Sequence, residues 1–535
     1  MIMLKRKKLL HPLVFFYNFI AKKIKMGLFD KKIAKKVEQE RTTSGFFIGA
    51  AEAEGEANNT KITLSEVFED FLAILSQLNN EKFIVTGRKG SGKSAIGEYL
   101  YSIAYNEPNL FATFIKKSDI DIERIVQIGE RQGLSVQPEL LFKWVILTQL
   151  LKLICQNENT SKLKEKKDLK LFLERNRGFI DIKNAEVSEI IKENGIQVNL
   201  EYFKRFYTAT GSKKWTIKES KAEFYKLLPY LEETILNIMK QDTDNNYILI
   251  FDDLDIGYSR KSESSLNSLA ELLRVAKYYN NEVFGRNSII SKIVILLRND
   301  IAKHLFFNAD TAKIFASYAV ELNWFEEAYR SQEDNLKLKQ FINKRIRANF
   351  ERKGWLVGER PWEAFINEAE FIPYGSNNKS SFKYIIDHTF FRPRDLILVF
   401  KDLDLYKFKI PLGRADINIL LGNYSTLIIS EIQNELTAIF TPDEINSIFH
   451  ILKRYEDKRP FTYVSLKLNL ENAGFTTNAE EVIEELFYYS LIGNMKESGD
   501  VVFKFREKGG EICKLDPSER FILCYILKVF FKNSN

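Results

Sequence analysis

Three short, mainly apolar runs in the first 300 residues of the chain have the pattern of buried strands. They are Lys82–Thr86, Tyr247–Phe251 and Lys292–Leu297. Runs of this length between polar residues are typical of strands that are covered on both faces. Two further runs, Leu110–Ile115 and Tyr318–Leu322, are expected to add strands.

A helical pattern lies between the second and third of these runs. It places Leu266, Leu269, Leu273 and Ala276 on one helical face. Strands that alternate with helices are typical of a parallel sheet with crossover helices. The pattern therefore predicts an α/β fold.

Helical patterns predominate elsewhere up to about Lys407. Pro138 opens a strongly apolar helix, and Lys221–Lys240 is an amphipathic one. Between them, Ser161–Arg177 carries seven Lys/Arg against three acids. We interpret this segment as a solvated helix face, and contact with nucleic-acid phosphates is the alternative. The stretch from about residue 117 to 245 is then a helical insertion.

The last hundred residues have the pattern of a winged helix. The expected elements are a helix capped by Thr441 and Glu444, helices over Tyr463–Ala473 and Ala479–Tyr489, a hairpin of Leu491–Met495 with Val501–Phe505, and a last helix from Asp516 to Phe530. Thr441 and Glu444 have the spacing of a capping box, with Pro442 at the first helical position.

Composition narrows the class of protein. A chain of 535 residues is too long for one core, and with 45% apolar and 28% charged residues it is neither disordered nor fibrous. Its three cysteines and four histidines have no disulfide-framework or zinc spacing. These features favour a reducing compartment, and we expect the cytoplasm.

The net charge of +7 comes from the N-terminus, because residues 1–41 hold 12 Lys/Arg against 3 Asp/Glu and the remainder holds 67 against 69. An apolar run, Leu9–Ile20, follows Lys5–Lys8 and is shorter than the ~20 residues that span a membrane. Three interpretations stay open: translation that starts at Met26, a basic peripheral anchor, or a secretory signal without an evident cleavage site.

The strongest motif is Gly87-Arg88-Lys89-Gly90-Ser91-Gly92-Lys93-Ser94, followed by Ala95. It has the form G-x-x-x-x-G-K-S and stands between a predicted strand and a predicted helix, which is the context of a phosphate loop. Its glycines allow backbone N–H groups and the helix N-terminus to surround a phosphate. We expect Gly87 to Ala95 to bind the nucleotide, with Lys93 at the β- and γ-phosphates and Ser94 as a Mg²⁺ ligand.

The second strand ends in Asp252-Asp253-Leu254-Asp255. Carboxylates at the carboxyl end of a parallel strand lie beside a phosphate loop in the same sheet. We expect Asp252 to complete the Mg²⁺ shell and Asp253 to orient or deprotonate the attacking water, with Asp255 as a second candidate. The alternative is a strand end with solvated acids.

The third strand ends in Arg298-Asn299-Asp300. A polar side chain at this tip can sense the γ-phosphate. Arg298 is our candidate and Asn299 the alternate, while a structural salt bridge is the other interpretation.

These motifs resemble the additional-strand class of P-loop ATPases. The Asp-Asp-Leu-Asp strand end resembles the STAND and KAP-type signalling ATPases of bacteria, with origin-recognition-type AAA+ relatives close behind. The loop, together with Leu297-Arg298-Asn299-Asp300-Ile301, looks like a bacterial ATPase family often met near phage-defence genes. The resemblance implies slow turnover and switching, because Asp253 stands where fast ATPases of this class have Glu. No guanine-specifying Asn-Lys-x-Asp occurs, which favours ATP.

The resemblance extends to Phe391-Arg392-Pro393-Arg394-Asp395. In the STAND and origin-recognition relatives a proline here closes over the nucleotide and a nearby arginine touches the γ-phosphate. This implies Arg394 as a sensor, with Arg392 as the alternate. The small residue usual before the proline is absent, and pairing of both arginines with surface acids is the other interpretation.

Together these observations predict an α/β P-loop NTPase with a parallel sheet. The expected division is a basic segment (1–45), an ATPase core with the insertion (46–324), a helical lid (325–424) and a winged-helix domain (425–535). The lid and the winged helix are expected to move with nucleotide state.

The expected function is that of a slow, Mg²⁺-dependent ATPase that acts as a switch or assembly module. By resemblance, its setting is bacterial anti-phage defence with a protein partner as effector, and self-assembly is possible. The alternative is a DNA-handling ATPase, which the four glutamates of the third winged-helix helix (Glu480, Glu481, Glu484, Glu485) disfavour. A third hypothesis is a scaffold that binds ATP without hydrolysing it. No nuclease or protease motif is visible, so an effector would be a partner or lie in the insertion.

Overall fold

The protein is described by a computed structural model. It describes residues 40–116, 137–157, 166–180, 197–209, 215–254, 263–305, 309–326, 332–371, 380–437, 439–457, 459–475, 477–506 and 513–533. Residues Thr43–Asn535 form one compact unit, distinct from Met1–Thr42. The apolar N-terminal run and Met26 lie outside the described residues. No helix among the described residues is long and apolar enough to cross a membrane.

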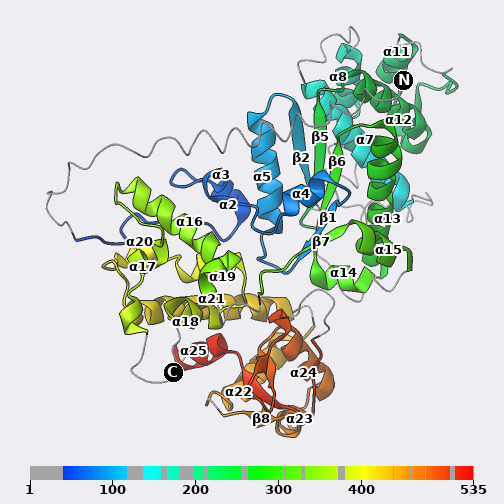
Figure 1. The fold of residues 1–535 in the computed structure, drawn as a ribbon. Coiled ribbons are helices and arrows are strands. Elements are labelled where there is room, and N and C mark those ends of the chain that lie inside the picture. The colour runs from blue at the N-terminus through cyan, green and yellow to red at the C-terminus, as the bar shows by residue number, and fades with distance from the viewer. Residues whose placement is uncertain are drawn as a thin grey trace, which may run out of the picture. The chain divides into compact units, whose positions relative to one another are not determined.

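A five-stranded parallel sheet is the centre of the first half of this unit (Figure 1). Its order is β2 (Leu110–Lys116), β5 (Asn246–Asp252), β6 (Lys292–Arg298), β1 (Ile84–Gly87) and β7 (Ala319–Leu322). All five strands that the apolar runs predict are therefore present. Strand β6 lies between β1 and β5, the strands that precede the phosphate loop and carry the acidic residues.

The two faces of the sheet are covered differently. Val85, Ile250 and Val294 lie in a small cluster with α4 (Ile74–Asn79) and α5 (Lys93–Asn106). The residues next to them in the strands face a larger cluster. It includes α7 (Pro138–Gln156), α12 (Phe224–Gln241) and α13 (Glu263–Lys277). Burial on both faces explains why these strands read as continuous apolar runs.

The expected insertion is not separate from the sheet. Helix α7 belongs to the same buried cluster as the strand residues Leu249 and Phe251, so it covers the sheet as well as the outer elements. Those elements are α8 (Lys166–Arg175), α9 (Arg177–Ile180), α11 (Glu201–Ala209) and an antiparallel pair, β3 (Gln197–Asn199) with β4 (Lys221–Glu223). The sequence pattern did not predict this pair, which turns the first residues of the expected helix Lys221–Lys240 into a strand.

Helix α13 continues into a π-helical turn, Tyr278–Phe284, and a 3₁₀ turn, Gly285–Asn287. The buried Asn280 amide donates a hydrogen bond to the Ile293 carbonyl and accepts one from its N–H, both at 2.9 Å. This side chain therefore fixes the start of β6. Helices α14 (Asn299–Leu305) and α15 (Ala309–Tyr318) lead to β7.

A helical region follows the sheet, as the sequence predicts. It contains α16 (Lys337–Arg352), α17 (Pro361–Phe365), α18 (Ser381–Asp387), α19 (Pro393–Val399), α20 (Leu403–Tyr406) and α21 (Arg414–Leu436). The expected boundary at residue 424 falls inside α21, so we move it to the end of this helix. Residues just after Thr42 also pack here: the Thr43 hydroxyl donates to the Leu403 carbonyl (2.6 Å), and the Phe46 ring stacks on Phe365.

The C-terminal domain contains the three helices and the hairpin that the sequence predicts, two strands that it does not predict, and a last helix. They are α22 (Pro442–Lys453), β8 (Phe461–Thr462), α23 (Tyr463–Glu471), α24 (Ala479–Tyr488), β9 (Ile492–Met495), β10 (Val501–Val502), β11 (Arg520–Leu523) and α25 (Tyr525–Asn533). The predicted capping box is present, because the Thr441 hydroxyl accepts from the Glu444 N–H and the Glu444 carboxylate from the Thr441 N–H.

One prediction in this domain is wrong. A helix was expected directly after Asp516, but Arg520–Leu523 forms β11, which pairs antiparallel with β9 and β8. Phe521, Ile522 and Leu523 are all buried in the core, and this tertiary pairing overrides the helical start signal. The helix begins only at Tyr525.

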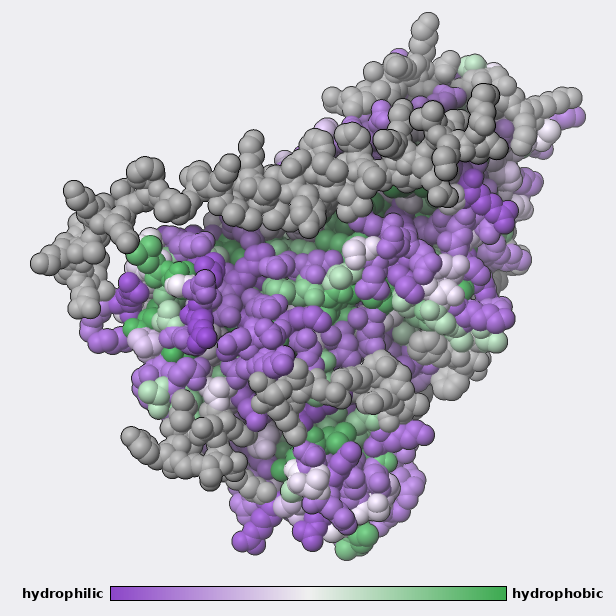
Figure 2. Space-filling model, in the orientation of Figure 1, coloured by the Kyte–Doolittle hydropathy of each residue, from purple (hydrophilic) through white to green (hydrophobic). Residues whose placement is uncertain are grey.

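The helical region and the C-terminal domain share one continuous apolar core, in which α21 lies against α25. The surface over the described residues is mostly hydrophilic on the face shown in Figure 2, with smaller hydrophobic areas between.

Candidate nucleotide-binding site

The phosphate loop connects the end of β1 at Gly87 with the start of α5 at Lys93. Gly90 and Gly92 have φ values of 78° and 100°, a conformation that L-residues rarely adopt. A Cβ on Gly92 would meet nothing within 4 Å, whereas one on Gly87 would lie 2.4 Å from the Ser91 hydroxyl. The loop is therefore open at Gly92 and closely packed at Gly87.

A cavity of about 380 Å³ opens over this loop. It brings together side chains that the sequence analysis selected from four separate segments: Lys93, Ser94, Asp252, Asp253, Arg298 and Arg394. The loop residues Lys89 to Ala95 also line it, but Gly87 and Arg88 do not. The volume is in the range typical of small-molecule sites.

Asp252 is buried, with only 4% of its surface exposed. It shares a hydrogen bond with the Ser94 side chain. Burial raises the pKa of Asp252, and the neighbouring charge of Asp253 raises it further. Glu98 on α5 has a raised pKa because of burial and the charge of Asp252. A cation beside Asp252 would offset both effects.

These residues fit a Mg²⁺ ion. The described residues hold no group of three or more His, Cys, Asp or Glu that could bind a metal on their own. Mg²⁺ is commonly held by only one or two protein groups together with phosphate oxygens and water. Ser94 and Asp252, in contact beside the phosphate loop, supply that number.

Lys93 and Asp253 both lie near Asp252, whose pKa the charge of Asp253 raises and that of Lys93 lowers. The Lys93 ammonium donates to the carbonyls of Gly87 (3.1 Å) and Arg88 (3.2 Å), so it lies over its own loop. Asp253 has a φ of 54°, and its N–H donates to the Asp252 carboxylate at 2.9 Å. Its own carboxylate lies 3.6 Å from the Lys116 ammonium. Asp255, the second candidate, lies outside the described residues.

Arg298 ends β6 and pairs with Asp300, from its Nε at 3.0 Å and its Nη2 at 2.7 Å. It lines the cavity, but the alternate, Asn299, does not. The Asn299 amide instead donates to Glu321 at 2.6 Å.

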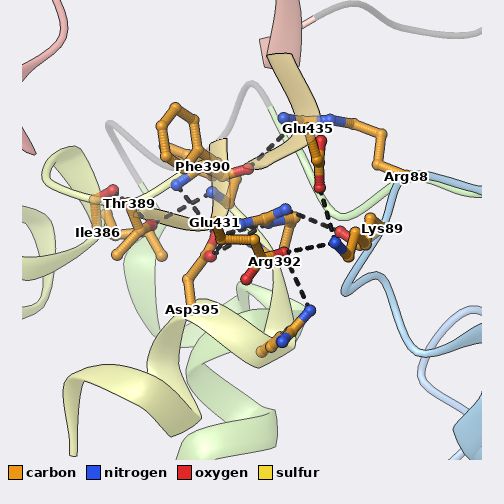
Figure 3. Close-up of polar contacts among 11 residues, drawn as sticks. Arg88, Lys89, Ile386, Thr389, Phe390, Arg392, Asp395, Glu431 and Glu435 are labelled. Atoms are coloured by element: carbon orange, nitrogen blue, oxygen red, sulfur yellow. Dashed lines mark hydrogen bonds and ion pairs between the residues drawn. The ribbon is translucent and has the colours of Figure 1, made fainter. Parts of the chain in front are cut away.

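The two arginines around Pro393 point in different directions. Arg394 lies against the phosphate loop, because a Cβ on Gly90 would be 3.0 Å from its Cβ and Cδ, and it lines the cavity. Its Nη1 donates to Glu431 at 3.0 Å. Arg392 is buried with Asp395 (2.6 Å) and donates to the Lys89 carbonyl at 2.9 Å (Figure 3). This placement agrees with Arg394, and not Arg392, as the residue facing a ligand.

Two residues expected at the nucleotide have side chains turned away from it. The Arg88 guanidinium donates to the Phe390 carbonyl (3.1 Å) and lies over the Phe505 ring. Burial lowers the pKa of Arg88 to about 10, with Arg392 as the next cause. The Lys89 ammonium pairs with Glu435 (2.9 Å) and Glu431 (3.4 Å) of α21 (Figure 3). Arg88 therefore does not reach the cavity, and Lys89, which lines it, has its ammonium paired with α21.

Sequence reasoning missed an ion pair at the edge of the cavity. Arg345 of α16 and Glu56 of α2 (Ala53–Ala57) are both nearly fully buried, and both line the cavity. The Arg345 guanidinium also lies 3.9 Å from the centre of the Phe341 ring. Burial raises the pKa of Glu56, while Arg345 opposes the shift. The two residues are 289 positions apart, so no local pattern could have paired them.

Comparison with known proteins adds a family match in the helical region. Residues 336–410 match a family model described as a FunZ-associated C-terminal helical domain. This span runs from α16 to α20 and includes both Arg392 and Arg394. No curated protein matches the sequence.

Two solved structures align over most of the chain. A structure of Drosophila ORC bound to DNA is 9% identical, with a TM-score of 0.25, and the alignment covers 98% of this chain and 100% of that one. The Aeropyrum pernix ORC2 protein in its ADP form is 11% identical, with a TM-score of 0.27, covering 94% and 96%. Scores this low carry no argument about what this chain binds.

The described architecture nevertheless has the parts of a P-loop ATPase. The loop follows β1 and opens α5, the acidic pair ends β5, and β6 lies between these two strands. The predicted fold class, an α/β P-loop sheet followed by a helical region, is confirmed.

Proposed function

We propose that this chain binds ATP with Mg²⁺ in the cavity over the phosphate loop and hydrolyses it slowly. The observation that carries the proposal is the convergence of Lys93, Ser94, Asp252, Asp253, Arg298 and Arg394 on one cavity, from segments as much as 301 positions apart. If these six side chains only formed structural ion pairs, they would not need to gather around an open glycine loop.

Each side chain has a distinct role in the proposal. Lys93 leaves the loop carbonyls to contact the β- and γ-phosphates, while Ser94 and Asp252 hold the metal ion. The ion neutralises charge on the phosphates when bound. Asp253 positions the attacking water, and Arg298 and Arg394 contact the γ-phosphate.

Slow turnover is expected because Asp253 is short and already engaged. Its carboxylate lies 3.6 Å from the Lys116 ammonium in the ligand-free chain, so it must leave this contact to position a water. An ATPase that turns over slowly can hold two conformational states for long periods, as a switch requires. The helical region and the C-terminal domain share one core, so a movement at Arg394 would reach both.

The proposed setting is bacterial anti-phage defence with a partner protein as effector, in the cytoplasm. It rests on the resemblance of the phosphate loop, together with Leu297–Ile301, to a bacterial ATPase family often met near phage-defence genes. The division into a basic segment, an ATPase core, a helical lid and a C-terminal domain, with boundaries at residues 45, 324 and 437, is part of the same proposal.

A DNA-handling ATPase, which would use the expected winged helix, is the alternative. The C-terminal domain argues against it for this chain. Glu480, Glu481 and Glu484 are exposed on α24, the helix that would enter the major groove. These carboxylates would repel phosphates, and Lys467, the cation at 2.6 Å from Glu480, is already paired.

The test is ATP hydrolysis by the full chain with and without double-stranded DNA. Lys93→Ala is the control for the site, and Asp253→Asn separates hydrolysis from binding. Asn tolerates the left-handed backbone of residue 253, so this substitution changes the charge with little strain. We expect slow turnover that is indifferent to DNA and about a hundredfold lower in both variants, with ATP binding retained in Asp253→Asn.

Other outcomes select another function. Binding without measurable turnover in the wild type would leave the non-hydrolysing scaffold. Turnover raised about tenfold or more by DNA, roughly 1.4 kcal/mol in the barrier, would favour the DNA-handling ATPase. Turnover that survives Lys93→Ala would place the reaction outside this cavity.

A further inference from the structure

One carboxylate oxygen on α21 is shared by two cations of the site. Glu431 Oε1 lies 3.0 Å from Arg394 Nη1 and 3.4 Å from the Lys89 ammonium. Lys89 has a second partner, Glu435, at 2.9 Å. These three contacts connect the phosphate loop, α19 and α21 (Figure 3).

Arg394 stands between this carboxylate and the cavity. Its aliphatic part lies against Gly90, and its side chain lines the cavity. Its Nε has no hydrogen-bond partner among the described residues, so the guanidinium is held by Glu431 from one side only. A planar guanidinium with unused donors can reorient toward a second acceptor without losing many bonds.

The arrangement allows an exchange of partners at low cost. Glu431 is largely buried, with 14% of its side chain exposed, and a buried carboxylate that loses its only cation is costly. Here the ammonium of Lys89 remains at the same oxygen if Arg394 leaves. The charge of Glu431 is therefore neutralised whether Arg394 is bound to it or released. The charge of the released Arg394 is neutralised only if an anion fills the cavity.

We propose that Glu431 is a positioning residue that holds Arg394 away from the nucleotide and releases it to a γ-phosphate. The proposal rests on the proposed function, because it assumes that ATP occupies the cavity. ATP and ADP then differ in their use of Arg394: the triphosphate competes with Glu431 for the guanidinium, and the diphosphate lacks the group that would do so. The contact with Glu431 thus sets how strongly the site prefers ATP over ADP.

The test measures the dissociation constants of ATP and ADP, both with Mg²⁺, for the full chain and for Glu431→Gln. Glutamine keeps the size of the side chain but removes the charge that competes for Arg394. We expect the ratio of the ADP constant to the ATP constant to rise about five- to tenfold, because only ATP binding breaks the contact.

Glu435→Gln is the matched control. Glu435 lies one turn further along α21, is similarly buried and pairs with Lys89 but not with Arg394. We expect its ratio to stay within about twofold of the wild type. A double variant, Glu431→Gln with Arg394→Ala, is expected to show no gain over Arg394→Ala alone, because the residue that Glu431 restrains is missing.

The outcomes separate the inference from the proposed function. If the wild type binds neither nucleotide, both fall. If it binds both and Glu431→Gln changes the two constants equally, ATP binding stands and the role of Glu431 is overturned. An equal gain in Glu431→Gln with and without Arg394 would likewise overturn it, since the effect would not act through that residue.

Discussion

The two sides of the phosphate loop are built in different ways. The side that faces the cavity consists of residues adjacent in sequence, Gly90 to Ser94, together with strand ends that the sheet brings beside them. The other side is held by contacts from more than 300 positions away: the Arg88 side chain binds the Phe390 carbonyl, and the Lys89 carbonyl accepts from Arg392.

The difference shows that one loop can serve two purposes: phosphate binding on one side and attachment to the rest of this chain on the other. The cavity side offers glycine backbone, Lys93 and Ser94, which any phosphate loop of this form would offer. The opposite side uses Arg88 and Lys89, two of the four variable positions of the motif, to join the loop to the helical region and to Phe505 of the C-terminal domain. We expect damage to the two sides to have separable effects.

The largest effect is expected from the buried network behind the loop. Asp395 accepts hydrogen bonds from the backbone N–H groups of Phe390 and Arg392 and from the Arg392 guanidinium, and it is fully buried. Asp395→Ala leaves Arg392 buried without its partner, which should lower the free energy of unfolding by about 3–5 kcal/mol. Urea denaturation measures it.

The matched control for this variant is Glu363→Ala. Glu363 pairs with Arg360 at the same i,i+3 spacing, but on the surface of α17. Its loss should cost no more than about 1 kcal/mol. If Asp395→Ala costs as little as this control, the back of the loop is not held by a buried network and the comparison of the two sides fails.

The sequence predicted the cavity side well because its signals are local. Apolar runs, a glycine motif and acids at a strand end each lie within about ten residues, and the parallel sheet brings them together. The capping box at Thr441 and Glu444 is local in the same way. The strand order, with β6 between β1 and β5, agrees with the class that the motifs resemble.

The other side could not be predicted, because its residues find their partners only in the folded chain. Lys89 reads as a loop residue at a phosphate until α21 brings Glu431 and Glu435 beside it. The pair of Arg345 with Glu56 and the strand at Arg520–Leu523 are missed for the same reason. A helix that crosses an expected boundary, as α21 does at residue 424, gives no sign in a periodic pattern.

A second prediction concerns the cavity side, where function opposes stability. Burial and the charge of Asp253 raise the pKa of Asp252, so the ionised carboxylate destabilises the ligand-free fold at neutral pH. Asp252→Asn should therefore raise the free energy of unfolding, by about 0.5–2 kcal/mol, while it removes Mg²⁺-dependent ATP binding. Thermal unfolding and nucleotide titration of the same samples measure both.

The sign of the pH dependence checks the cause. Between the ordinary pKa of 3.8 and the raised one, the folded state binds more protons than the unfolded state, so stability falls as pH rises through this window. The advantage of Asp252→Asn should be greatest near neutral pH and should vanish below about pH 4, where the wild-type residue is protonated in both states. An advantage that persists at low pH would assign the gain to packing and not to charge.

The smallest effect is expected from Lys89→Ala, and it bears most directly on the comparison. The Lys89 side chain is 38% exposed, so its pairs with Glu431 and Glu435 are screened by water and should each contribute at most about 1 kcal/mol. We expect turnover to change by less than about threefold, with a difference from the wild type that shrinks further in high salt. Lys93→Ala, four positions along the same loop, should instead lower turnover about a hundredfold at any salt concentration. Steady-state hydrolysis at low and high ionic strength compares the two lysines. If Lys89→Ala proves as damaging as Lys93→Ala, the Lys89 ammonium reaches the nucleotide when it is bound, as the sequence alone suggests, and the two sides of the loop are not separate.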